Sequence, residues 1–282
     1  MKYANEKNNI LYDLDGAEEQ DIRDSEIDGY KVKITKPGQM LEAELYPYCK
    51  HKATASRAKK AITSIAQEEV NNRNALRRLV RLIEHNFVMY RDYKGGLDFD
   101  DMPTPEEAQR RISLFLRNMR SLYKRHGIEL KYIYVTPWAT KTGRPVKRLH
   151  THMIYTGGVP FEEVKALWPW GRVHMDPLQP DKNGFMGAAI YLWKHLHGAK
   201  RWVPSRNLVM PESRYPKHRV TKRRAAKIAA DYETARDIFE RQHPGYTFVD
   251  MQVRHSSVMP GAYIYVRMRR IDADTIKPKR RE

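Results

Sequence analysis

The sequence predicts an α+β fold: an antiparallel sheet with helices packed on it. Short segments with alternating apolar residues, typical of strands, are interleaved with longer segments of helical periodicity. Between residues 85 and 205 these segments follow the order β-α-β-β-α-β-α. The 282 residues allow one sizeable domain with additions, or two small domains.

Local signals place each element of this central unit. Thr104, followed three residues later by Glu107, is a capping signal for a helix that Gly127 ends. We expect Gly95-Gly96 and residues 98–103 to form a loop. Strands are predicted at 86–93, 130–136, 148–155 and 171–178, and helices at 104–126, 161–168 and 185–197. This order favours a two-layer domain, with helices on one face of the sheet, related to the ferredoxin-like (split βαβ) arrangement.

Additions flank the central unit on both sides. Residues 1–29 hold nine acids and three bases and predict a mobile arm, and residues 31–46 show enough alternation for a strand or two. Helical spacing over 56–84 predicts a basic helix, bent near Asn71-Asn72. The domains are therefore an acidic arm (1–40), a basic helical segment (41–84), the central unit (85–205), and a C-terminal helix (221–242) with a β-hairpin (246–254 and 262–268). We expect this C-terminal part, 206–282, to pack on the same sheet.

Composition points to an anionic partner. The formal net charge is +18, and residues 141–282 carry 28 Lys and Arg against 13 Asp and Glu, while residues 1–140 carry 24 against 21. Such surfaces attract phosphate backbones, although RNA or an anionic membrane would also suit them. The single Cys49 excludes an intramolecular disulfide and a cysteine-based zinc site. With neither a signal peptide nor a membrane span recognised, a cytoplasmic protein of a bacterial host cell is expected.

Two short motifs suggest chemistry. In Arg148-Leu-His-Thr-His-Met-Ile-Tyr155, an extended strand places His150 and His152 on one face, where both imidazoles can bind one metal ion. In Tyr191-Leu-Trp-Lys194, a helix places Tyr191 and Lys194 on one face, as a nucleophile and a charge-stabilising cation. Each motif is weak alone, since Tyr191 also suits an amphipathic surface and Lys194 a solvated charge. Together they suggest cleavage of a nucleic-acid strand by a tyrosine.

The sequence around these motifs resembles a known family. The similarity runs from about Leu41 to Arg270. It is carried by Asn71-Asn-Arg-Asn-Ala-Leu-Arg-Arg-Leu-Val-Arg-Leu-Ile83, Thr104-Pro-Glu-Glu-Ala108, Lys131-Tyr-Ile-Tyr-Val-Thr136, Gly157-Gly158, Lys200-Arg-Trp202 and Tyr263-Ile-Tyr-Val-Arg-Met-Arg-Arg270. The chain resembles the rolling-circle replication initiator (Rep) proteins of Gram-positive plasmids and filamentous-type phages, members of the HUH endonuclease superfamily.

This resemblance implies a metal-dependent nickase and strand transferase. Tyr191 would be the nucleophile that joins the 5′ phosphate of a nicked strand, with Lys194 supporting it and with Mn²⁺ or Mg²⁺ on His150 and His152. Relatives often have a glutamate, apparently the third ligand, where this chain has Pro137; His174 and Asp92 are candidates in its place. Residues expected to bind nucleic acid are Arg144, Lys147, Arg148, Lys200, Arg201 and Trp202.

Partners and alternatives follow from the same pattern. The substrate would be single-stranded DNA at a replication origin, and a host helicase would separate strands because no ATP-binding G-x-x-x-x-G-K-[ST] motif is present. A non-catalytic protein that binds single-stranded nucleic acid would keep the fold and the charge. A metal-dependent nuclease that activates water would keep the histidines without needing Tyr191.

Overall fold

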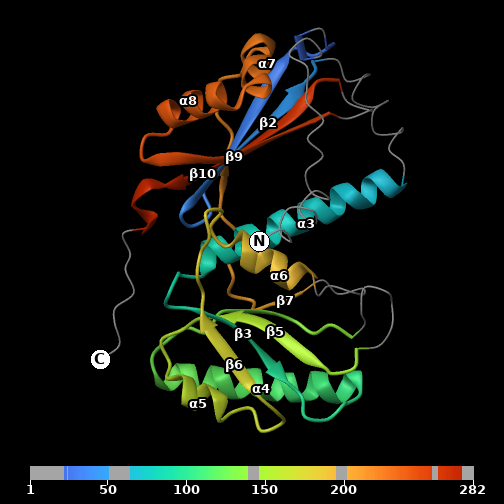
Figure 1. Cartoon of the computed structure of the whole chain (residues 1–282), viewed down its shortest axis with the longest axis vertical. Helices are drawn as coiled ribbons and strands as arrows, with labels where there is room; N and C mark the ends of the chain where they lie inside the picture. Colours follow the sequence, from blue (N-terminus) through green and yellow to red (C-terminus); the bar gives the residue numbers. More distant parts are fainter. Residues whose placement is uncertain are drawn as a thin grey trace. The chain divides into compact units, whose positions relative to one another are not determined.

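The chain forms two compact units. The computed structural model describes residues 22–23, 25–50, 64–138, 146–194, 202–255 and 260–274, with the backbone alone for 64–69, 194 and 273–274 (Figure 1). Unit 1 comprises Met1–Arg78 and Pro211–Lys277, and unit 2 comprises Leu79–Met210 and Pro278–Glu282. Within the described residues, no helix combines the length and the apolar character needed to cross a membrane.

Unit 2 is built on a five-stranded sheet. Its strands are β3 (Tyr93–Asp98), β4 (Tyr132–Val135), β5 (His150–Tyr155), β6 (Val173–Pro177) and β7 (Val203–Pro204), in the order β6-β3-β5-β4-β7. All neighbouring strands are antiparallel. The central strand is therefore β5, the strand that carries the paired histidines, and the α+β class with an antiparallel sheet is as predicted.

Helices cover both faces of this sheet, where the sequence predicted one. Met153 packs in the core formed with α4 (Pro105–Arg125) and α5 (Phe161–Lys165). His152, whose side chain points to the opposite face, meets α6 (Met186–Lys194) through Tyr191. Figure 1 shows α4 and α6 on opposite sides of the sheet. A third layer thus lies over the histidines, because α6 has an apolar face to bury, which includes Ala189 and Leu192.

The predicted strand at 86–93 is wrong, and so is the loop at Gly95-Gly96. Residues 87–92 form a turn, and β3 begins at Tyr93 and includes both glycines. A β-carbon on Gly95 would lie 2.1 Å from the His174 carbonyl oxygen. The two glycines therefore mark a close approach of neighbouring strands rather than a chain reversal.

Unit 1 has its own five-stranded sheet. Its strands are β1 (Gly29–Thr35), β2 (Met40–Tyr48), β8 (Ser213–Arg214), β9 (Tyr246–His255) and β10 (Ala262–Arg270), in the order β8-β1-β2-β10-β9. Helices α7 (Lys222–Ala230) and α8 (Tyr232–Gln242) bury Ala225, Ile228 and Phe239 against one face (Figure 1).

Unit 1 corrects the predicted domain division. The C-terminal hairpin was expected on the central sheet, but β10 pairs with β2. The strand or two predicted within residues 31–46 are β1 and β2, although the domain division placed the residues from 41 onward in a helical segment. The alternation in β2 buries Leu41 and Ala43 in the core and places Glu42 on the other face. The sequence signal was present in both strands, but pairing partners far apart in the chain are not encoded in a local pattern.

Two helix predictions also change in detail. Helix α3 (Ser64–Asn86) continues through Asn71 and Asn72 without a break. The predicted helix at 221–242 is two helices, because Asp231 has an extended backbone (φ −141°, ψ 121°) and caps α8 by accepting a hydrogen bond from the Thr234 amide. Of the predicted mobile arm, residues 1–21 and 24 lie outside the described residues.

Candidate active site

The two histidines of β5 share one face of the unit 2 sheet. His150 and His152 have ring centroids 4.5 Å apart, with ring planes at 81°. The Nδ1 atom of His150 lies 3.3 Å from the Arg148 carbonyl oxygen. A carbonyl oxygen only accepts, so in this contact Nδ1 carries the proton and a neutral His150 keeps its lone pair on Nε2. That is the state that a metal ligand requires.

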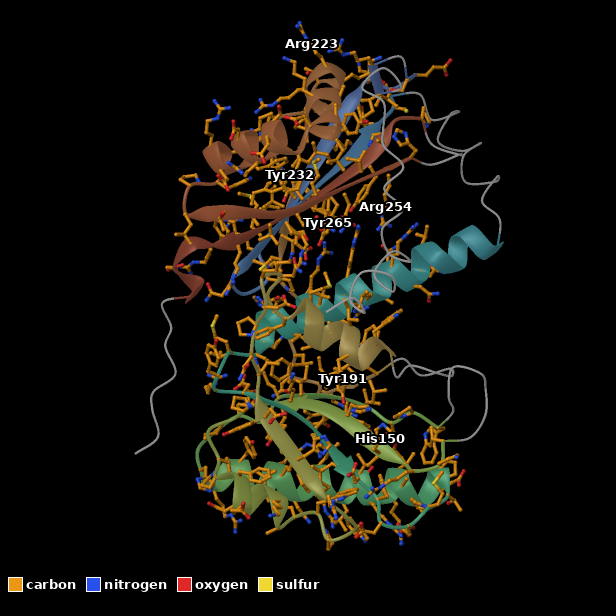
Figure 2. The ribbon with its side chains drawn as sticks, in the orientation of Figure 1. His150, Tyr191, Arg223, Tyr232, Arg254 and Tyr265 are labelled. Carbon is orange, nitrogen blue, oxygen red and sulfur yellow. The ribbon has the colours of Figure 1, made fainter. Side chains whose placement is uncertain are left out.

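Helix α6 brings Tyr191 onto the histidine pair. Its hydroxyl lies 2.8 Å from Nδ1 of His152, and the two rings are 4.8 Å apart between centroids. His152 is buried, whereas Tyr191 is 43% exposed. Figure 2 shows Tyr191 on α6 and His150 on the sheet below it. The predicted phenol and imidazoles are thus brought together, and the tyrosine residue is partly exposed to solvent.

Asp98 is a site residue that sequence reasoning missed. It ends β3 and is paired in register with His150. Burial is the main cause that raises the pKa of Tyr191 above 10.0, and the negative charge of Asp98 raises it further. The Asp98 carboxylate is also 3.8 Å from the Arg148 guanidinium. Only the register places it here, because the sequence separates Asp98 from His150 by a helix and a strand.

His174 lies on the same face, on the strand next to β3. Residue Gly96 is in register with both His152 and His174. A β-carbon on Gly96 would come within 2.7 Å of Cε1 of the His174 ring. The imidazole of His174 therefore occupies the space over Gly96, one strand away from His152.

Asp92, the other predicted third ligand, has a structural role. Its buried carboxylate accepts hydrogen bonds from the Val88 amide at 2.7 Å, the Gly157 amide at 2.9 Å and the Arg91 side chain. It precedes Tyr93, so it lies at the end of β3 away from Asp98. Among the described residues, no three His, Cys, Asp or Glu side chains are already grouped to hold a metal ion.

Tyr155 and Tyr132, two other tyrosines of unit 2, are poor nucleophiles. Tyr155 is buried on the α4 side of the sheet, and its hydroxyl contacts the sulfur of Met175. Burial raises the pKa of Tyr155 well above its ordinary value. Tyr132 is also buried, and its hydroxyl accepts a hydrogen bond from Arg120 at 2.7 Å. Tyr191 alone among these three combines exposure with contact to the histidines.

The remaining predicted residues are only partly described. Lys194 ends α6, but its side chain lies outside the described part, as do Arg144, Lys200 and Arg201. Lys147 is exposed, and Arg148 is exposed beside Asp98. Trp202, the predicted stacking residue, has its ring centroid 6.2 Å from that of Trp193.

Comparison with known protein families matches the part of the chain that contains these residues. Residues 95–197 match a family described as replication-associated protein ORF2. The match begins in β3 and includes β5 and α6, so it contains His150, His152, Tyr191 and Lys194. No curated protein and no solved structure matched the chain. This stretch of the chain is therefore similar to replication-associated proteins, and the similarity supports a role in the initiation of replication.

Proposed function

We propose that the chain is a rolling-circle replication initiator that nicks and rejoins single-stranded DNA through Tyr191. The observation that carries this proposal is the 2.8 Å contact between the hydroxyl of Tyr191, a partly exposed residue of α6, and the buried His152 of the sheet. The match of residues 95–197 to a replication-associated family supports the same conclusion.

The proposed reaction exchanges one phosphodiester bond for another. The Tyr191 oxygen attacks the scissile phosphorus and forms a new P–O bond, while the bond from phosphorus to the 3′ oxygen breaks. The proton that leaves the phenol is balanced by the proton that the 3′ oxygen gains. The products are a 5′-phosphotyrosine and a free 3′ hydroxyl, and attack by a 3′ hydroxyl reverses the step and rejoins the strand.

The phenol needs assistance to react at neutral pH. Burial and the charge of Asp98 hold its pKa above 10.0, so the protonated form dominates. Contact with His152 offers one form of help: if Nε2 of His152 is a metal ligand, the ring proton is on Nδ1, and this N–H donates to the Tyr191 oxygen. Such a hydrogen bond stabilises the developing phenolate. The ammonium group of Lys194 is proposed to add positive charge in the transition state.

A divalent metal ion is proposed to bind on this face of the sheet, where two imidazoles of β5 lie side by side. His150 and His152 would hold it through Nε2, and Asp98 is proposed as the third ligand, because β3 places it beside His150 and because an oxygen ligand suits Mn²⁺ or Mg²⁺. Asp98 would have to turn from Arg148 to complete the set. When bound, the ion would polarise the scissile phosphate and stabilise charge on its oxygens.

Single-stranded origin DNA is the proposed substrate, and a host helicase the proposed partner. Labelled single-stranded DNA that contains the origin, incubated with the protein and Mn²⁺, should give a protein–DNA adduct that survives a denaturing gel. Tyr191→Phe should abolish the adduct and leave DNA affinity within about threefold, because one hydroxyl adds little beside many phosphate contacts. Tyr232→Phe, at a tyrosine of unit 1 that is 44% exposed and so comparable with Tyr191, is the matched control and should retain the adduct.

Three results separate the proposal from its alternatives. Cleavage without an adduct would indicate a nuclease that activates water at the histidines. Binding without cleavage at any Mn²⁺ concentration would indicate a non-catalytic single-strand-binding protein. An adduct that persists in Tyr191→Phe would assign the nucleophile to another tyrosine.

A further inference from the structure

Unit 1 carries a dense basic segment that the proposed active site does not use. From Ser213 to Ala230 the chain has seven Lys and Arg and no Asp or Glu. Its cations lie on and before α7, and they are Arg214, Lys217, Arg219, Lys222, Arg223, Arg224 and Lys227. We call these seven residues the α7 basic surface.

The fold holds this segment in a defined position. Its first residues form β8, which pairs with β1, and Val220 exchanges two backbone hydrogen bonds with Tyr30 at 2.8 and 3.0 Å. Thr221 then caps α7 by accepting a hydrogen bond from the Arg224 amide. The buried face of α7 contributes Ala225 and Ile228 to the unit 1 core. The backbone that carries the cations is therefore anchored at several points.

The exposed face of α7 displays its charge to solvent. Arg223, Arg224 and Lys227 are exposed. Arg223 and Arg224 are adjacent in the helix, and Lys227 lies four residues after Arg223, so all three are on the side away from the buried alanines. Figure 2 shows Arg223 at the outer side of α7. Lys217 and Arg219, just before the helix, are exposed as well.

The cations of this surface are not paired with carboxylates of the described residues. Within the described part of the chain, none of its seven cations is ion-paired with Asp or Glu, whereas Arg110, Arg236 and Arg270 on other elements each have a carboxylate within 2.9 Å. Lys222 donates instead to the Ser25 carbonyl oxygen at 3.0 Å, and Arg219 lies 4.2 Å from the ring centroid of Tyr48. Cations gathered without counter-charges repel each other, and a polyanion relieves that repulsion.

We propose that the α7 basic surface binds the phosphate backbone of double-stranded DNA. A helix N-terminus flanked by arginines presents both amide groups and guanidinium groups to phosphates. Proteins that hold single strands combine a basic groove with several stacking aromatic rings. On the described part of this surface Tyr215, 63% exposed, is the one strongly exposed aromatic residue. The surface thus suits a rigid row of phosphates better than a chain of unpaired bases.

This proposal does not depend on nicking by Tyr191. It assigns to unit 1 a separate task, that of holding duplex DNA through contacts that are independent of base sequence. The test therefore uses binding of the full chain without metal, measured by fluorescence anisotropy with a labelled duplex over a range of salt concentrations.

The test variant is Arg223→Gln/Arg224→Gln/Lys227→Gln. Its affinity for duplex DNA should fall by about tenfold or more near physiological salt. The negative slope of log affinity against log salt should become shallower by up to roughly 2.7, since each lost phosphate contact removes about 0.9 from its magnitude. The matched control is Arg110→Gln/Arg117→Gln/Arg125→Gln on the exposed side of α4, which removes the same charge from unit 2. The control should retain most of the affinity.

Two further variants make each outcome decisive. The charge-conserving variant Arg223→Lys/Arg224→Lys/Lys227→Arg should keep the affinity for duplex DNA. If the triple glutamine variant does not fold, the single change Arg223→Gln replaces it, and the salt slope should then become shallower by about 0.9. The proposal is overturned if the α7 and α4 variants lose affinity equally, or if neither does. It is also overturned if the affinity of the α7 variant for single-stranded DNA falls as strongly as its affinity for duplex DNA. The same holds if this variant loses binding to acidic phospholipid vesicles while its affinity for duplex DNA is unchanged.

Discussion

The Tyr191 hydroxyl lies 2.8 Å from Nδ1 of His152, although 39 residues separate them in the chain. The contact joins a helix to the central strand of the unit 2 sheet. It also couples the chemistry of the two side chains, because the ring nitrogen facing the phenol either donates to it or accepts from it. A proton acceptor at Nδ1 would leave the phenol protonated, whereas a donor there would favour the phenolate.

The first prediction concerns pH. Burial and Asp98 raise the pKa of Tyr191, so the phenolate fraction is small at pH 7. As long as the pH is below that pKa, the phenolate fraction increases about tenfold for each unit by which the pH rises. The single-turnover rate of adduct formation should therefore rise between about pH 6.5 and 8.5, with a log–log slope approaching 1. Rapid-quench measurements at saturating DNA and Mn²⁺ would test this. DNA affinity, measured in parallel, serves as the control, and a flat rate profile would contradict attack by a minor phenolate species.

The second prediction concerns the histidine pair. His150→Ala together with His152→Ala should remove metal-dependent cleavage, because the strand face then retains neither imidazole ligand. Adduct formation would be followed across a Mn²⁺ titration, with binding of a single-stranded oligonucleotide as a check on folding. Unchanged cleavage at every Mn²⁺ concentration would rule out a metal site on β5.

The third prediction separates two roles of Asp98. If Asp98 is a metal ligand, Asp98→Asn should weaken Mn²⁺ binding by about tenfold or more and slow nicking. If it acts only as a neighbouring charge, its loss should lower the pKa of Tyr191 and make nicking faster at neutral pH. Calorimetric Mn²⁺ titration and the single-turnover rate together distinguish the two roles, because the rate changes in opposite directions. Asp101→Asn, at an exposed residue after β3, is the comparison variant.

The fourth prediction uses the two glycines of β3. Gly95→Ala should lower stability by roughly 1–3 kcal/mol, because the new methyl group meets the backbone of β6 at 2.1 Å. Gly96→Ala should cost less, since its nearest neighbour is the movable His174 ring. Thermal unfolding measures both. With Asp98 as the ligand, Gly96→Ala should leave Mn²⁺ affinity nearly unchanged; a tenfold loss would favour His174 as the third ligand instead.

Sequence patterns predicted the elements that carry the site. The alternation in β5 and the apolar spacing in α6 are local signals, and they placed His150, His152 and Tyr191 on the correct elements. Asp98 escaped prediction because its position depends on the register between β3 and β5, which local patterns do not define. Gly95 and Gly96 resemble turn residues in isolation, and only the neighbouring strand explains why a β-strand contains them.

The architecture of unit 1 was harder to predict for the same reason. Strands β2 and β10 are both recognisable as strands, but their pairing joins Leu45 to Ile264 and Met40 to Arg269, residues near opposite ends of the chain. The second sheet therefore depends on contacts that no local pattern specifies. Asp231 illustrates the same limit on a smaller scale, since its role as a cap is visible only once α7 and α8 are known to be separate.

The last prediction concerns Lys194, which follows Tyr191 by three residues on α6. If its ammonium group stabilises charge in the transition state, Lys194→Ala should slow nicking by about tenfold to a thousandfold, equivalent to roughly 1.4 to 4 kcal/mol, with little change in DNA affinity. Lys194→Arg should recover only part of this rate, because a planar guanidinium on a longer side chain places its charge differently. Single-turnover nicking at saturating DNA measures both variants, and Lys124→Ala, at an exposed lysine of α4, controls for the loss of one positive charge in unit 2. If Lys194→Ala and Lys194→Arg both react within about twofold of the unmodified protein, Lys194 is a surface residue and the assistance to Tyr191 must come from the sheet alone.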